Sequence, residues 1–246
     1  MIRSLTARAL RGAFAVAALS ALAACSAMRE PIAPASVHAL GVAPMCGDEV
    51  SREFYDRGNL GNSSFTKSSF DGWDLRTPLV EPLRAKLPLA RIDVLEVDKR
   101  EMFVALIAVS PRTSQTFERA FKADISPYDH LLVIYPMLSI GQYDRLEGIG
   151  VYTATSNPIL GLRESVVQPG QAHAYCRAFL YDTAKKHVVA MPVLSEKETL
   201  AADYPSQRTW DEMSEAERER FREPLTRLTR TLGTRLADEL FGGAPK

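Results

Sequence analysis

The sequence has few of the side chains from which metal and cofactor sites are built. Its 246 residues include three cysteines and four histidines, and the histidines occur singly at His38, His130, His173 and His187. A protein metal site needs three or four converging ligands, and no two of these histidines have the spacing of a ligand pair. We therefore expect no metal site and no cofactor.

Known catalytic motifs are also missing. The sequence has no Gly-x-Ser-x-Gly nucleophile elbow, and it has no P-loop, dinucleotide-binding fingerprint or His-Glu-x-x-His zinc motif. Gly148-Ile149-Gly150 forms a Gly-x-Gly, but the third glycine and the following helix of a nucleotide-binding loop are lacking. At this position the sequence instead predicts a β-bulge or a close approach of two backbones. We assign no catalytic residue from these motifs.

An excess of one charge is missing as well. The 30 basic residues are balanced by 30 acidic residues, and no stretch is both basic and rich in aromatic residues. A nucleic-acid-binding surface needs clustered positive charge, so no nucleic-acid partner is expected. The 46% hydrophobic and 24% charged residues are typical of a globular chain, and its length suits one domain with a sizeable core.

The N-terminus has the pattern of a secretory signal peptide. Arg3, Arg8 and Arg11 give a positive start, and a mostly apolar stretch follows at 12–24. A helix over this stretch would be about 20 Å long, too short for a hydrocarbon core of about 30 Å. The stretch therefore predicts a signal peptide that is removed, in preference to a transmembrane anchor.

The end of this stretch, Leu22-Ala23-Ala24-Cys25, resembles the lipobox of bacterial lipoproteins. The resemblance implies that Cys25 is lipidated and becomes the first mature residue. Several acyl chains make such attachment to the membrane effectively permanent. Because Ser26 follows in place of an aspartate, the resemblance implies the outer membrane, with the protein facing the periplasm. We expect a signal peptide at 1–24, a lipidated N-terminus and flexible tether at 25–47, and one periplasmic domain at 48–246.

Two further cysteines, Cys46 and Cys176, remain after lipidation of Cys25. The periplasm is oxidising, so the sequence predicts a disulfide between them. The alternative is that Cys176, which lies in an apolar run, is a buried free thiol.

The rest of the sequence alternates between helical and strand patterns. The clearest helix starts with a capping box of Ser214 and Glu217, carries a leucine stripe and ends at Gly242. Pro224 lies inside it and predicts a kink or a break. Residues 101–109 fit either a helix or a strand. Further helices are expected at 78–87 and 114–125, and strands at 91–98, 130–138, 148–155, 173–182 and 187–194, the last two forming a hairpin.

These elements predict an α/β fold with a mixed, partly parallel sheet, flanking helices and a long C-terminal amphipathic helix. The uninterrupted apolar run at 130–138 is typical of a strand that is covered on both faces. The pattern is similar to the small α/β domains of envelope lipoproteins of the curli-export and penicillin-binding-protein-activator types.

Polar residues follow two of the expected strands. If 91–97 and 130–138 are parallel neighbours, the ends of both strands lie at one edge of the sheet, where ligands bind in α/β folds. This places Asp98 near a polar loop, and the alternative is that the loop is only solvated. The candidate ligand or partner residues are Asp98, Gln142, Tyr143, Asp144 and Arg145.

The leading hypothesis is a non-enzymatic lipoprotein, anchored in the membrane through Cys25, that contacts an envelope protein in assembly or maintenance of the envelope. A first alternative is a periplasmic hydrolase whose site is built from Asp98, Asp144 and a histidine. A second is a small-ligand binding module with a pocket near Tyr143 and Tyr152.

Overall fold

The computed structural model describes residues 31–56, 63–107, 114–140, 145–155 and 169–242. They belong to a compact unit that begins at Pro31. Within the described part of the chain, no helix is both long enough and apolar enough to cross a membrane.

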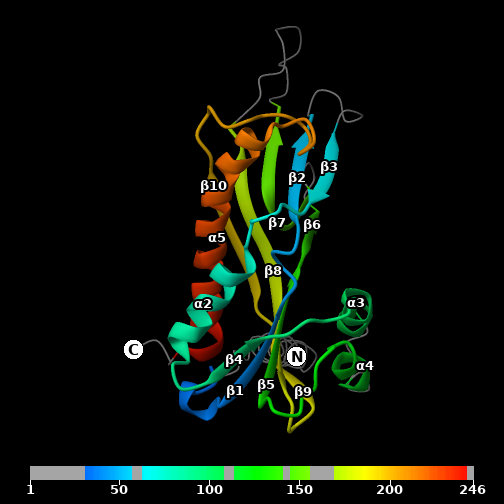
Figure 1. The fold of residues 1–246 in the computed structure, drawn as a ribbon, viewed down its shortest axis with the longest axis vertical. Helices are drawn as coiled ribbons and strands as arrows, with labels where there is room; N and C mark the ends of the chain where they lie inside the picture. The colour runs from blue at the N-terminus through cyan, green and yellow to red at the C-terminus, as the bar shows by residue number, and fades with distance from the viewer. Residues whose placement is uncertain (1–30, 57–62, 108–113, 141–144, 156–168, 243–246) are drawn as a thin grey trace, which may run out of the picture. The chain divides into compact units, whose positions relative to one another are not determined.

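The domain is built on a mixed sheet in which one long strand, β8 (Gln171–Asp182), belongs to two halves (Figure 1). The first part of β8 pairs with β7 and β10, and its second part pairs with β5 and β9. The upper half of the sheet, as seen in Figure 1, consists of β3 (Ser64–Ser68), β2 (Val50–Tyr55), β7 (Arg145–Ala154), β8 and β10 (Val193–Thr199). The lower half consists of β4 (Arg91–Val94), β1 (Ala39–Pro44), β5 (His130–Pro136), β8 and β9 (His187–Ala190).

The chain passes from the lower half to the upper half through residues 45–49, the crossing loop. In the lower half, β1 runs parallel to both β4 and β5. In the upper half, β2 runs parallel to β7 and antiparallel to β3. Cys46 of the crossing loop is joined by a disulfide to Cys176, which lies at the middle of β8. The disulfide therefore links the two halves where they meet.

Two helices cover one face of the sheet, α2 (Arg76–Lys86) and α5 (Glu215–Phe241), and they lie side by side (Figure 1). The capping box predicted for α5 is present, because Ser214 Oγ accepts from Glu217 N while the Glu217 side chain accepts from Ser214 N. Its predicted stripe is fully buried and forms the main core with α2 and the inner faces of the strands. The buried stripe residues are Phe221, Leu225, Leu228, Leu232, Leu236 and Leu240.

A second, smaller core lies on the other face of the lower half. It is covered by α3 (Lys99–Ile107) and α4 (Ser114–Arg119). Met102 of α3 and Phe117 of α4 pack there against Tyr181 and Phe179 of β8. The segment at 101–109, which fits either a helix or a strand in the sequence, is thus helical up to Ile107.

The structure places the start of the domain earlier than the sequence prediction of residue 48. A short 3₁₀ turn at Pro34–Ser36 leads into β1, which lies between β4 and β5. Leu40 and Val42 point into the main core and are fully buried. The prolines and small residues of this segment suggested a tether, but two flanking strands satisfy its backbone and its alternating apolar side chains fill the core.

Three element predictions also differ from the structure. β4 and β5 are parallel, but β1 lies between them, so they are not neighbours. The expected strand at 187–194 is divided into β9 and β10 at Met191-Pro192, since proline lacks the donor that continuous pairing requires. Finally, α5 runs without a break through Pro224, which is buried, because packing of the whole helix outweighs the loss of one internal hydrogen bond.

Candidate functional site

A polar region lies where the crossing loop meets an arm that leaves the sheet. We call β6 (Leu138–Ile140) and residues 145–147 of β7 the arm, because they pair with each other as a separate ribbon. The arm joins the main sheet at Gly148, which has φ of +64°, a value that glycine adopts without strain. A cavity of about 70 Å³ lies between the arm and the crossing loop. Its polar lining includes Asp48, Ser51, Lys67, Lys99 and Glu147.

Ion pairs surround this cavity. Lys99 Nζ lies 2.8 Å from Asp48 Oδ2, and Arg76 Nε lies 3.5 Å from Asp48 Oδ1. Lys67 of the edge strand β3 pairs with Glu147 of the arm. Each lysine that lines the cavity thus has a carboxylate partner.

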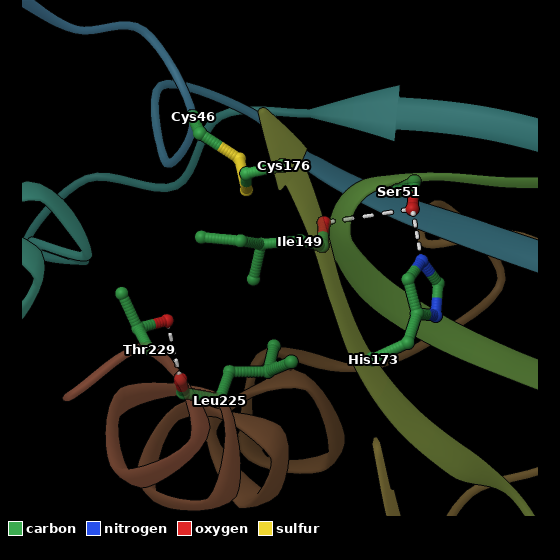
Figure 2. Close-up of a disulfide and its surroundings, with 7 residues drawn as sticks. All are labelled: Cys46, Ser51, Ile149, His173, Cys176, Leu225 and Thr229. Carbon is green, nitrogen blue, oxygen red and sulfur yellow. Dashed lines mark hydrogen bonds between the residues drawn. A yellow bond between two sulfur atoms is a disulfide. The ribbon is translucent and has the colours of Figure 1, made fainter. Parts of the chain in front are cut away.

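A buried polar cluster of Ser51, Glu53 and His173 lies behind the cavity. Ser51 Oγ is 3.3 Å from His173 Nε2 and 3.3 Å from Glu53 Oε1, and all three side chains are almost completely buried. Glu53 Oε1 also accepts a hydrogen bond of 3.0 Å from the backbone nitrogen of Glu147 in the arm. Figure 2 shows Ser51 between the His173 ring and the carbonyl oxygen of Ile149. The cluster therefore fastens the arm to the sheet.

Gly150 is required for this arrangement. A Cβ atom at position 150 would lie 1.9 Å from Ser51 Oγ and 2.4 Å from the Ser51 carbonyl oxygen. β2 and β7 therefore approach each other closely here, as the Gly148-Ile149-Gly150 pattern predicts.

The cluster contains a serine, a histidine and a carboxylate, but its geometry is not that of a catalytic triad. Glu53 lies 3.6 Å from the same ring nitrogen, Nε2, that contacts Ser51, whereas a triad acid holds the other nitrogen. Among the described residues, His173 Nδ1 has no hydrogen-bond partner. Burial lowers the pKa of His173 from 6.5 to about 3. A histidine that resists protonation this strongly is a poor general base at neutral pH.

The buried His173 makes the stability of the protein depend on pH. Its folded-state pKa lies below the unfolded value, so the unfolded chain binds a proton that the folded protein excludes between pH 6.5 and 3. We expect the free energy of unfolding to fall by about 2 kcal/mol between pH 6.5 and 5 because of this residue. Urea unfolding at a series of pH values measures the effect. His173→Gln should flatten the profile relative to the protein with His187→Gln, a change at an exposed position. Equal profiles for the two variants would show that His173 does not control acid stability.

The structure accounts for only some of the predicted site residues. Asp98 Oδ1 accepts a hydrogen bond of 2.9 Å from Glu101 N and so caps the start of α3. Tyr152 is half-buried on β7 and does not line the cavity. Gln142, Tyr143 and Asp144 lie outside the described residues, and of Arg145 only the backbone is described, where it pairs with Ile140. The neighbours of these residues, Lys99 and Glu147, are nevertheless brought together at the cavity.

Sequence reasoning missed Ser51 and Glu53 and gave His173 no partner. In the segment at 50–55, the buried apolar residues Val50 and Phe54 lie on the same face of the strand, four positions apart. A period-two pattern could have identified the strand. Arg52 lies between these two residues on the same face, so the sequence does not show that face as apolar. Ser51 and His173 are 122 positions apart, so no local pattern indicates that they are in contact.

The described residues around the cavity have neither the ligand groups of a metal site nor the volume of a large-ligand pocket. Among them, no group of three or more histidine, cysteine or acidic side chains is placed to hold a metal ion. The cavity of about 70 Å³ is far smaller than the roughly 300–1,000 Å³ of pockets that enclose organic ligands.

Comparisons with known proteins give distant structural similarities only. No protein-family model matches the chain, and no curated protein sequence matches it. The hypothetical protein CT253 from Chlamydia trachomatis aligns over 82% of this chain and 97% of its own length, with 10% identity and a TM-score of 0.35. Protein XCC0632 from Xanthomonas campestris, of the DUF330 family, aligns over 87% of this chain and 90% of its own, with 11% identity and a TM-score of 0.34. Similarity at this level supports no conclusion about function, so the role of the protein is unassigned.

Proposed function

We propose that the protein is a lipoprotein of the outer membrane, anchored through a lipidated Cys25 and facing the periplasm, whose domain contacts another envelope protein in assembly or maintenance of the envelope. The observation that carries this proposal is the buried disulfide between Cys46 and Cys176. Structural disulfides form in oxidising compartments, and a lipobox directs a protein to one. Both features are therefore typical of proteins in the same compartment, the periplasm.

Exposed apolar side chains on both sides of β8 support the idea of a protein partner. Leu138 lies on the β7 side, Met191 and Val193 lie on the β10 side, and we call these three residues the junction patch; their exposed fractions are 40%, 51% and 39%. Val193 pairs with Arg177 across β8 and β10, while Met137 N donates to Tyr175 O on the other side of β8. Exposed apolar residues beside tyrosine and arginine are typical of protein interfaces.

The test of this proposal is site-specific photocrosslinking in cells. A photoreactive amino acid at Val193 should give one recurrent adduct, and the adduct should be lost when Cys25→Ala removes the anchor. Phe103, a 58% exposed apolar residue on α3, serves as a matched control for non-specific crosslinking at an exposed apolar position. Metabolic labelling with a fatty acid should mark the wild-type protein and not the Cys25→Ala variant.

Two results would contradict the proposal. Equal crosslinking at Val193 and Phe103 would mean that the junction patch has no specific partner. Absence of fatty-acid label on the wild-type protein would mean that Cys25 is not a lipid anchor.

A further inference from the structure

The chain enters the domain at one end of the sheet, the lower end in Figure 1. His38 O accepts from Arg91 N, directly before β1 and β4 start together. The start of β5 and the finish of β8 lie at the same end, because His130 pairs with Asp182. Four adjacent strands thus end within about 15 Å of one another. We call this end, with the turns at 88–90 and 183–186, the entry end.

The start of the domain is fixed to the entry end by a contact of its own. Ile32 N donates a 2.9 Å hydrogen bond to Leu240 O, near the end of α5. α2 and α5 run in the same direction, since Trp73 bonds to Glu219 and Lys86 to Asp238. Both helices therefore finish at the entry end, beside the point where the chain comes in.

The length of chain before Ile32 limits how far this end lies from a lipid anchor. Ile32 is seven positions after Cys25, and seven extended residues span at most about 25 Å. The opposite end of the sheet lies farther away, because β8 alone has 12 residues and a length of about 40 Å. With the acyl chains of Cys25 in the membrane, the entry end must remain close to the lipid surface.

The entry end carries an unusually exposed apolar side chain. Leu89 lies in the turn that follows α2 and has an exposed fraction of 94%, the highest of the exposed large apolar residues described. The neighbouring Leu87 is buried in the core, so the turn itself is held in place. Burying a leucine in an apolar environment is favourable, whereas leaving it in water is not.

The entry end also presents cations that are more exposed than their acidic partners. In the turn between β8 and β9, Lys185 pairs with Asp182 and Lys186 pairs with Glu118. The lysine side chains are 69% and 63% exposed, whereas the carboxylate side chains are only 9% and 23% exposed. The positive groups thus face outwards, as they do in proteins that lie on anionic lipid headgroups.

We propose that the entry end is a membrane-contacting surface, in which Leu89 inserts among the lipids and Lys185 and Lys186 lie at their phosphate groups. The occupant is the same lipid surface that holds the acyl chains, so this inference rests on the proposed lipid anchor. Contact of the entry end with the membrane orients the domain so that the upper half of the sheet faces the periplasm.

The test uses the full lipidated protein in vesicles of phosphatidylethanolamine and phosphatidylglycerol. Leu89→Cys introduces a single free thiol, since Cys25 is acylated and Cys46 and Cys176 are joined. Ala202→Cys, at an exposed position beyond β10 at the opposite end, is the matched control. Each variant is labelled with a bulky maleimide on vesicles. The rate of labelling is compared with the rate for the same variant in soluble form, in which Cys25→Ala removes the anchor.

We expect labelling at position 89 to be about tenfold slower on vesicles than in solution, equivalent to ~1.4 kcal/mol of protection. The rate at position 202 should be unchanged. Equal rates at position 89 in both forms, with the protein floating with the vesicles, would overturn membrane contact and leave the lipid anchor standing. Failure of the protein to float with the vesicles would overturn both.

Discussion

Replacing both Cys46 and Cys176 with alanine is expected to lower the free energy of unfolding by about 3–5 kcal/mol. The disulfide closes a loop with a sequence separation of 130, so its removal frees a large part of the unfolded chain. Alanine is chosen because both cysteines lie in the core, with exposed fractions of 1% and 0%, where a new hydroxyl would lack a partner. Urea unfolding of the protein with Cys25→Ala, under non-reducing conditions, measures the change.

The position of the disulfide also predicts which part of the domain loses most local stability when the disulfide is removed. It joins the crossing loop to the middle of β8, so without it the crossing loop, from which β2 starts, is no longer cross-linked to β8. Amide hydrogen exchange in β2 should accelerate more than exchange in α5. An unchanged urea midpoint in the double variant would show that the disulfide adds nothing to stability.

Trp210→Ala is expected to destabilise the protein by about 3–5 kcal/mol, because a large buried side chain is lost and leaves a cavity. Trp210 has an exposed fraction of 1%, and its Nε1 donates to Val50 O at 3.1 Å. Its ring also packs edge-on against Phe221 near the start of α5. Loss of this side chain therefore weakens the contact of β2 with α5 as well as the core, and calorimetry or urea unfolding measures the effect.

Trp73, the other tryptophan, provides the matched control. It is half-buried and its Nε1 donates to the exposed Glu219. Trp73→Ala should cost less than half as much as Trp210→Ala, since less apolar surface is lost from the core. Equal losses of stability for the two variants would show that Trp210 contributes no more to the core than Trp73 does.

Local patterns in the sequence were enough to predict the elements whose residues interact with close neighbours. α5 has its cap, its stripe and its stop within one continuous stretch, and all three are present. The strands at β5, β7 and β8, and the hairpin of β8 with β9, follow for the same reason. The mixed α/β class follows from the order of these elements.

The candidate site depended on contacts that no local pattern contains. Ser51 and His173 meet because β2 and β8 both pair with β7. The strand order was also needed to identify β1 as a strand. The prolines and small residues of this segment predict a tether, and only its position between β4 and β5 shows that it belongs to the sheet. The prediction that the strands at 91–97 and 130–138 are neighbours, with Asp98 at their shared edge, is wrong because β1 lies between them.

The sequence by itself therefore determined the fold class, the long C-terminal helix and the expectation of a lipid-anchored periplasmic protein, since each rests on residues close together in the chain. Only the tertiary structure decided where the domain starts, how Cys46 and Cys176 join the two halves of the sheet, and which polar side chains share the interior. The physical reason is that alternation of side chains specifies the face of a strand but not its neighbours. Those neighbours are selected by the burial of the whole core, which involves residues from the entire domain.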